Sequence, residues 1–264
     1  MKLGFIGCGN MASAIMSGII SNGLMKADEI IGADVFAPSR EKAKENLGIQ
    51  IAENNREVVE KAEAFVLSIK PQFYEEVIRE IKDVVREDQL IITLAPGKTL
   101  EWLKAQFGKS VKIVRTMPNT PAMVLEGMTA ACPNEYVTEA ELEKVLSILR
   151  AFGEAEVVPE KLIDAVVAVS GSSPAYVFMM IEAMADAAVA EGMPRAQAYK
   201  FAAKAVMGSA KMVLETGKQP GELKDMVCSP GGTTIEAVKV LEATGFRSSL
   251  MEAMEACAEK SRSL

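Results

Sequence analysis

The sequence predicts an α/β fold in which a mostly parallel sheet is followed by a segment made of helices alone. Up to about residue 160, short apolar runs alternate with longer amphipathic stretches, an order that is typical of βαβ units. From about residue 162 onward, apolar residues recur at helical spacing and no strand-like run remains. We therefore expect two domains, residues 1–160 and residues 161–264.

The first domain contains clear candidates for strands and for the helices between them. The strands are expected at 2–6, 29–33, 64–69, 90–95 and 111–116, and the helices at 10–23, 39–48 and 73–85. The run LIITL at 90–94 could be buried on both of its faces. Such runs are typical of parallel strands that helices cover on both sides.

The second domain is expected to hold helices at 174–193, 195–217, 233–245 and 246–263. Gly192, Gly217 and Gly245 stand where these helices should end. The stretch 174–190 is apolar on several faces, which predicts burial all round. We therefore expect a homodimer or a higher homo-oligomer, formed through this all-α dimerisation domain.

Composition and charge exclude several classes of protein. The formal net charge of −7 and the absence of a basic run argue against nucleic-acid binding. The chain has no histidine, and its four cysteines are scattered without a CxxC pair, so we expect no metal site. We interpret the cysteines as small core residues in a reducing compartment. With no signal peptide and no apolar run of the ~18 residues that span a bilayer, we expect a cytoplasmic protein that does not bind membranes.

A glycine-rich loop follows the first predicted strand and opens the first predicted helix. It reads GCGNMA over residues 7–12, the pattern G-x-G-x-x-A. Gly7 permits the sharp turn, Gly9 lets the backbone approach a pyrophosphate, and the small residue Ala12 lets the helix pack on the sheet. The N-terminus of the helix then faces the phosphates. The loop predicts dinucleotide binding, with a tight turn that holds no ligand as the alternative.

Residues beyond the second strand leave the choice of dinucleotide open. Asp34 could bond a ribose 2′-hydroxyl, which favours NAD. Ser39 and Arg40 could hold a 2′-phosphate, which favours NADP, although Ser39 could instead cap a helix and Arg40 could be solvated. Asn55 could reach the adenosine or act as a helix cap. We expect NADP as the cofactor, with NAD also possible.

Three further strand ends carry Gly, Pro or Asn. They read SIKPQ at 68–72, LAPGKT at 94–99 and RTMPNTPA at 115–122. In a parallel sheet, the carboxyl ends of the strands line the crevice where a cofactor lies. Together these segments predict a nicotinamide pocket, with Gly97 and Asn119 as candidate contacts.

A second glycine-rich loop, SPGGTT at 229–234, precedes a helix of the second domain. We expect the backbone N–H groups of Gly231, Gly232 and Thr233 to be free at the helix start and to bind a carboxylate. Ser229 and Thr234 would add hydroxyl groups. A plain capped helix is the alternative, but two glycines lose backbone entropy that an ordinary cap does not require. One loop would then hold the pyrophosphate of the cofactor and the other a substrate carboxylate.

Taken together, these motifs resemble the pyrroline-5-carboxylate reductase family. The resemblance rests on GFIGCGNM at 4–11, IKP at 69–71, RTMPNTPA at 115–122, VSGSSPAYVF at 169–178, EGMPRAQA at 191–198 and LKDMVCSPGGTTIEAV at 223–238. It runs through both domains. It implies a Rossmann domain, a helical domain that dimerises, and the last step of proline biosynthesis, in which NADPH or NADH reduces 1-pyrroline-5-carboxylate to L-proline.

The resemblance also implies roles for single residues. The substrate carboxylate would lie on residues 229–232, and Thr234 would place a catalytic hydroxyl beside the imine nitrogen. The implied cofactor contacts are Gly7, Gly9, Asn10, Met11, Asn55, Ser68, Lys70 and Pro71. At 94–97 this chain reads LAPG where the family often has Ala-Ala-Gly, and Pro96 lacks an N–H that could point at the nicotinamide.

Two other functions stay open. One is another oxidoreductase of similar layout that uses a lysine borne on a helix, such as Lys204 or Lys211. The other is a nucleotide-binding regulator without activity. In a chain without histidine, any proton must come from a hydroxyl, a lysine, a carboxyl group or water.

Overall fold

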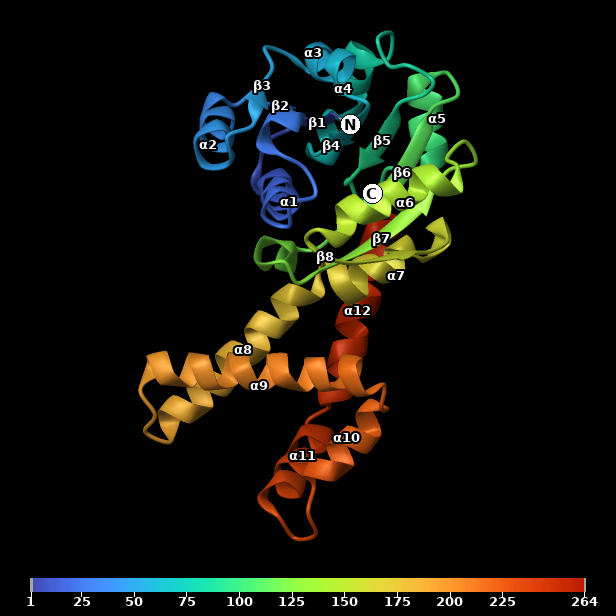
Figure 1. Cartoon of the computed structure of the whole chain (residues 1–264). Coiled ribbons are helices and arrows are strands. Elements are labelled where there is room, and N and C mark those ends of the chain that lie inside the picture. Colours follow the sequence, from blue (N-terminus) through green and yellow to red (C-terminus); the bar gives the residue numbers. More distant parts are fainter. Residues whose placement is uncertain (1, 264) are drawn as a thin grey trace. The chain divides into compact units, whose positions relative to one another are not determined.

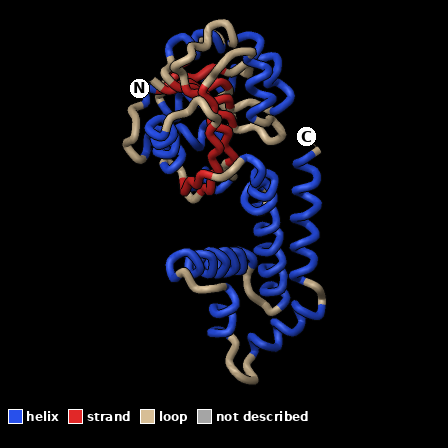
Figure 2. The backbone as a smooth tube through the Cα atoms, turned by 90° about the vertical axis from the view of Figure 1, so that its right-hand side faces the viewer, coloured by secondary structure: helices blue, strands red, loops and turns tan. Residues whose placement is uncertain are grey.

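The computed structural model describes residues 2–263, which form two compact units. Unit 1 comprises residues 2–172 together with 257–263, and unit 2 comprises Ser173–Ala256. All strands lie in unit 1, and unit 2 consists of helices and loops (Figure 2). The units divide the chain after residue 172 and not after residue 160, because residues 161–172 pack with the sheet.

Unit 1 is built on a single twisted sheet with the strand order β3-β2-β1-β4-β5-β6-β7-β8 (Figure 1). Neighbouring strands are parallel except for the antiparallel pair β6 and β7. The strands are β1 (Leu3–Ile6), β2 (Ile30–Ala33), β3 (Gln50–Ile51), β4 (Ala64–Leu67), β5 (Leu90–Thr93), β6 (Lys112–Met117), β7 (Gly127–Pro133) and β8 (Gly153–Val157). The five expected strands and the mostly parallel sheet are therefore confirmed.

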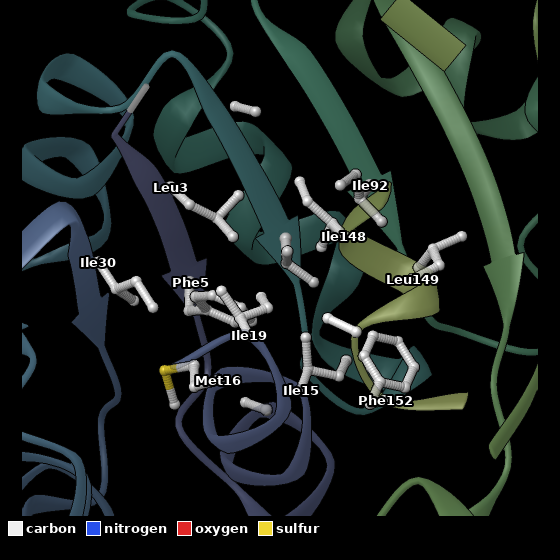
Figure 3. Close-up of a cluster of buried hydrophobic side chains, with 14 of the residues drawn as sticks. Leu3, Phe5, Ile15, Met16, Ile19, Ile30, Ile92, Ile148, Leu149 and Phe152 are labelled. Atoms are coloured by element: carbon white, nitrogen blue, oxygen red, sulfur yellow. The ribbon is translucent and has the colours of Figure 1, made fainter. Parts of the chain in front are cut away.

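Helices cover both faces of this sheet. They are α1 (Asn10–Ser21), α2 (Ala37–Leu47), α3 (Asn55–Lys61), α4 (Tyr74–Ile81), α5 (Leu100–Phe107), α6 (Glu139–Arg150) and the short α7 (Ile163–Val166). Successive residues of a strand point to opposite faces. Leu3 and Phe5 of β1 accordingly pack with α1 and α6 (Figure 3), whereas Ile6 packs with α3, α4 and α5. This two-sided burial explains why the central strands are apolar at nearly every position.

Local signals set the helix boundaries, and they correct two expectations. Helix α3 is capped by Asn54, whose side chain accepts the N–H of Glu57, so Asn55 is not the cap. Helix α2 begins at Ala37 after Phe36, which makes no side-chain capping bond, so Ser39 is not a cap either. The alternatives in which Ser39 and Asn55 act as helix caps are therefore wrong.

Unit 2 contains α8 (Ser173–Ala190), α9 (Arg195–Thr216), α10 (Pro220–Val227), α11 (Thr233–Ala243) and the first part of α12 (Phe246–Arg262). The four expected helices are present, and α10 is an additional one. Helix α9 ends at Gly217, whose φ of 62° lies in the left-handed region that glycine adopts without strain. A π-helical turn, Val167–Gly171, precedes α8.

Unit 2 exposes many large apolar side chains. They include Phe178, Met179, Phe201, Leu214 and Met251, each more than 60% exposed. One helical stretch, Glu160–Ala190, is also long and apolar enough to cross a membrane by length and composition. The expectation that no apolar run approaches this length was therefore wrong. Apolar surface on this scale is typical of a face that another chain covers.

Candidate functional site

The first glycine-rich loop opens where the order of strands in the sheet reverses. Strand β1 lies between β2 and β4, and the loop begins directly after its last residue, Ile6. The N–H of Gly7 donates to the carbonyl of Ala33 at 2.7 Å. Gly7 has a φ of 96°, and a Cβ atom there would collide with the carbonyl oxygen of Ser68. Only glycine fits between the ends of β2 and β4, where α/β proteins bind dinucleotides.

The second glycine of the loop has a different environment. Gly9 precedes α1, and no side chain caps the helix start. A Cβ atom at Gly9 would meet nothing within 4 Å, so packing within the chain does not demand glycine there. The bare N-terminus of α1, with Asn10 and Met11 in its first turn, is open to an anion.

A pocket of about 250 Å³ lies beside Gly7. It is lined by apolar side chains together with three carboxylates and one amide: Ile6, Gly7, Asp34, Val35, Asn55, Ile69, Phe73, Glu76, Val77 and Glu80. The amide nitrogen of Asn55 donates to Glu80 Oε2 at 2.8 Å. The position of this pocket beside the glycine-rich loop, and its apolar walls, fit an adenosine. The bare helix start and this pocket together fit a dinucleotide, so the first loop is compatible with NADP or NAD.

The residues expected to choose between the two cofactors lie close to one another. The carboxylate of Asp34 accepts the N–H of Cys8 at 2.7 Å and the N–H of Phe36 at 2.9 Å. Arg40 donates from its guanidinium to the backbone carbonyl of Asp34. Ser39 lies in the first turn of α2 and is partly exposed. The structure thus brings Asp34 and Arg40 together at the end of β2.

Two of the strand-end loops are tied together by a residue that sequence reasoning missed. The buried hydroxyl of Tyr74 donates to the carbonyl of Leu67, the last residue of β4, at 2.7 Å. It also accepts the N–H of Leu94, just after β5, at 3.3 Å. Burial raises the pKa of Tyr74, so this hydroxyl keeps its proton. Tyr74 follows the loop with Ser68, Lys70 and Pro71, but only the fold reveals its partners.

Asn119 lies in the third strand-end loop and is almost wholly buried. Its side-chain oxygen accepts the N–H of Met128 at 2.9 Å, and its side-chain nitrogen donates to the carbonyl of Ser170 at 3.0 Å. Both ends of the amide therefore bond within unit 1. Gly97, in the loop after β5, has a φ of 74° and is partly exposed.

The second glycine-rich loop lies in unit 2, directly before α11. Gly231 has a φ of 68° and open space around it, and no side chain caps the helix. The N–H of Gly232, however, donates to the carbonyl of Ser229 at 3.0 Å. The expectation that this N–H is free was therefore wrong. The bond between the Gly232 N–H and the Ser229 carbonyl closes this loop into a turn.

Each glycine of this loop also has a local reason to be glycine. Gly231 supplies the left-handed φ. A Cβ atom at Gly232 would force the Ser229 hydroxyl to move and would lie 3.2 Å from the Ser229 carbonyl oxygen. The entropy argument from the sequence does not, by itself, require a ligand. Thr233 and Thr234 occupy the first two positions of α11, with Thr234 partly buried. A bare helix start flanked by hydroxyls remains suited to a carboxylate.

The other candidate residues show no comparable setting. Lys204 and Lys211 are both exposed on α9, and Lys211 lies 3.9 Å from Glu215 one turn further on. Within residues 2–263, no group of three or more His, Cys, Asp or Glu side chains could hold a metal ion. All four cysteines are free thiols.

Comparison with known proteins assigns both parts of the chain. Residues 160–264 match the family model described as pyrroline-5-carboxylate reductase dimerisation, and residues 2–97 match the one described as NADP oxidoreductase, coenzyme F420-dependent. A pyrroline-5-carboxylate reductase from Escherichia coli strain K12 is 55% identical, over 100% of this chain and 98% of the relative.

Two solved structures are similar over nearly the whole length. The pyrroline-5-carboxylate reductase of Coxiella burnetii superimposes with a TM-score of 0.92 at 35% identity, covering 99% of this chain and 97% of the other. The pyrroline carboxylate reductase of Plasmodium falciparum, solved with NADP bound, has a TM-score of 0.91 at 32% identity, covering 100% and 97%.

Proposed function

The chain belongs to the pyrroline-5-carboxylate reductase family, and we propose that it reduces 1-pyrroline-5-carboxylate to L-proline with NADPH as the hydride donor. The observation that carries the proposal is the presence of both glycine-rich loops in a chain that matches these reductases from end to end. This reaction is the last step of proline biosynthesis.

We assign the dinucleotide to the first loop and its surroundings. The first domain, residues 1–160, would hold the pyrophosphate on the start of α1 and the adenosine beside Asn55. The proposed contacts are Gly7, Gly9, Asn10, Met11, Ser39, Arg40, Asn55, Ser68, Lys70, Pro71, Gly97 and Asn119. Asn119 would make its contact through its backbone or its position, because its amide is already bonded at both ends. When bound, the cofactor supplies a hydride to the imine carbon.

The choice of NADPH over NADH is proposed to depend on Ser39 and Arg40. Arg40 already lies over the end of β2, bonded to the carbonyl of Asp34, and carries a positive charge that a 2′-phosphate would match. We expect activity with both cofactors and a modest lead for NADPH. An unchanged NADPH KM in Arg40→Ala would contradict this contact.

We assign the substrate carboxylate to the second loop. In the second domain, residues 161–264, it would bind at the start of α11 through backbone N–H groups and the hydroxyl of Ser229. Because the Gly232 N–H is used within the turn, we assign the carboxylate to the N–H groups of Gly231, Thr233 and Thr234. Gly232 would contribute by letting the loop close on the ligand.

Thr234 is the proposed catalytic residue. Its hydroxyl stands in the first turn of the helix that would hold the carboxylate, so it can face the ring of the same substrate. As hydride reaches the imine carbon, the C=N double bond becomes a single bond and the nitrogen ends up carrying one proton. A hydroxyl of ordinary pKa is a weak acid. We therefore propose that Thr234 orients the ring nitrogen or relays a proton from water.

We further propose an obligate homodimer that forms through the helices of unit 2. The exposed apolar side chains of α8, α9 and α12 are those that a second copy would bury. Such burial accounts for the apolar helix Glu160–Ala190 without a membrane. A monomeric mass by light scattering at micromolar concentration, together with full activity, would contradict this arrangement.

The four free cysteines agree with a reducing compartment, and we propose that the protein acts in the cytoplasm. The test of the function as a whole is an assay of NADPH oxidation in the presence of 1-pyrroline-5-carboxylate. Stoichiometric formation of L-proline would support the proposal. NADPH binding without turnover of the imine would favour a nucleotide-binding regulator, and oxidation driven only by other substrates would favour another oxidoreductase.

A further inference from the structure

We propose that Asp34 is a positioning residue that clasps the glycine-rich loop to the end of β2, and not a ribose ligand that selects NAD. An acidic residue at this place in a dinucleotide-binding fold is ordinarily interpreted as the acceptor of the ribose 2′-hydroxyl. The hydrogen bonds of this chain give it a different role.

The two carboxylate oxygens of Asp34 are divided between two loops. Oδ2 accepts the N–H of Cys8, inside the glycine-rich loop, at 2.7 Å. Oδ1 accepts the N–H of Phe36, in the loop that leads to α2, at 2.9 Å. Hydrogen bonds from backbone N–H groups to a carboxylate are stronger than those between neutral groups. A single side chain therefore fixes both loops that would flank the adenosine and the pyrophosphate.

The bonds of Asp34 belong to a row of contacts between the glycine-rich loop and the end of β2. One residue before Cys8, the Gly7 N–H donates to the carbonyl of Ala33 at 2.7 Å. The Cys8 thiol is buried 3.6 Å from the same carbonyl, and Arg40 donates to the backbone carbonyl of Asp34. The N–H groups of Gly7 and Cys8 thus bond to Ala33, the last residue of β2, and to Asp34, which follows it. The loop receives its shape from these contacts before any ligand arrives.

This arrangement makes a distinct prediction for the choice of cofactor, and it rests on the proposed use of a dinucleotide. NADP and NAD share the pyrophosphate and the adenosine and differ only at the 2′ position. A clasp that shapes the common part of the site must affect both cofactors equally. A ribose ligand, in contrast, would affect NAD far more than NADP.

The experiment uses the full chain with Asp34→Ala, Asp34→Asn and the control Asp83→Ala, which removes an exposed carboxylate of unit 1. Amide hydrogen exchange is followed residue by residue at Cys8 and Phe36. Ala52 is the internal reference, because its N–H donates to the carbonyl of Gly32 on β2 at 2.9 Å and does not involve Asp34.

For Asp34→Ala, we expect exchange at Cys8 and Phe36 to be at least about tenfold faster than in the parent, with Ala52 unchanged. Asp34→Asn offers only one side-chain acceptor, so one of the two amides should lose protection and the other keep it. Asp83→Ala should match the parent at all three positions. Faster exchange at Ala52 would show that Asp34→Ala loosens the whole unit. Exchange at Cys8 and Phe36 is then compared with that at Ala52 in Asp34→Asn instead.

Calorimetric titration with NADP⁺ and with NAD⁺ supplies the second readout. We expect both dissociation constants to rise by a common factor, roughly tenfold, so that their ratio stays within about twofold of that of the parent. Unchanged exchange at Cys8 and Phe36, or a loss of affinity confined to NAD⁺, would overturn the proposal. A parent protein that binds neither dinucleotide would contradict the proposed function instead, and the exchange data would still decide whether the clasp exists.

Discussion

Both loops are rich in glycine and lead into a helix, but they are held in place by different means. Loop 7–12 is held by residues distant in the chain, since Gly7 bonds to Ala33 and a Cβ atom there would meet Ser68. Loop 229–234 is closed locally, through the bond from the Gly232 N–H to the carbonyl of Ser229. Both lead into helices that no side chain caps.

The difference teaches that a glycine motif has two separable requirements. One is the packing of the loop in its own fold, and the other is the room it leaves for a ligand. At Gly7 packing alone demands glycine, whereas at Gly9 nothing in the chain does. In the second loop the requirements are local, because the turn is closed by its own backbone and Gly231 has open space around it.

The largest expected effect separates the two requirements within the first loop. Gly7→Ala places a Cβ atom against the carbonyl of Ser68 at a φ of 96°, so we expect a loss of about 3 kcal/mol in the free energy of unfolding. Gly9→Ala has open space and an ordinary φ of −71°, so its stability should stay within about 0.5 kcal/mol of the parent. Its affinity for NADP⁺ should nevertheless fall. Urea unfolding and calorimetric titration check both variants, and a destabilised Gly9→Ala would contradict this division of roles.

The second prediction concerns the chemistry of the second loop. Thr234→Val should lower kcat by ~10- to 100-fold, between the loss of one neutral hydrogen bond and the loss of a full general acid. The loss should grow at high pH, where less of the imine is protonated. Thr244→Val, at the other end of α11, is the matched control and should leave kcat unchanged. A kcat for Thr234→Val within about twofold of the parent at every pH would remove Thr234 from the mechanism.

A smaller effect is expected from the glycine that gives the second loop its turn. Gly231 has a φ of 68° and no atom within 4 Å of an added Cβ, so Gly231→Ala is opposed only by the left-handed backbone. The free energy of unfolding should fall by about 1 kcal/mol, well below the loss for Gly7→Ala. Urea denaturation of the two variants side by side tests the contrast. Equal losses would show that the second loop is packed as tightly as the first.

The smallest effect follows from the buried thiol of the first loop. Burial, reinforced by the charge of Asp34, raises the pKa of Cys8 to about 12. An unfolded thiol titrates near 8.5, so the stabilisation is fully present below that pH and is lost as the pH rises toward 12. At pH 9 the loss amounts to about 0.8 kcal/mol. The stability of Cys8→Ala, measured from pH 7 to 9, should fall less steeply than that of the parent, and equal slopes would contradict the assignment.

Sequence reasoning succeeded where the signal is local. Apolar runs predicted β1, β2, β4, β5 and β6, and the G-x-G-x-x-A pattern placed the first loop at the edge where the strands end. Strands β3, β7 and β8 were missed. β3 has two residues, β7 consists largely of small residues, and β8 carries two glutamates in five positions. β3 and β7 lack the contrast by which a strand is recognised in a sequence, and the alternation of Glu with Ala and Val in β8 is only four residues long.

Two details of the site could not be predicted because they depend on partners elsewhere in the chain. Tyr74 acquires its role from Leu67 and Leu94, and Asn119 acquires its role from Met128 and Ser170. No pattern along the chain encodes which backbone groups a buried polar tip will meet. The bond that uses the Gly232 N–H is local, but it depends on a turn type that the letters SPGG leave undetermined.

The return of α12 to unit 1 has a consequence for the order of synthesis. Unit 2 is an insertion, because the chain leaves unit 1 after Ser172 and re-enters it at Cys257, whose thiol lies 3.2 Å from the Ser172 hydroxyl. Ser261 is buried and donates its hydroxyl to Asp164 at 2.6 Å. On the ribosome, the sheet can form as soon as its strands emerge. The C-terminal segment of unit 1, which begins at Cys257, follows only after more than eighty further residues, the whole of Ser173–Ala256. The nascent unit 1 therefore passes through a stage in which its sheet is complete but Asp164 has not yet met its hydrogen-bond partner Ser261.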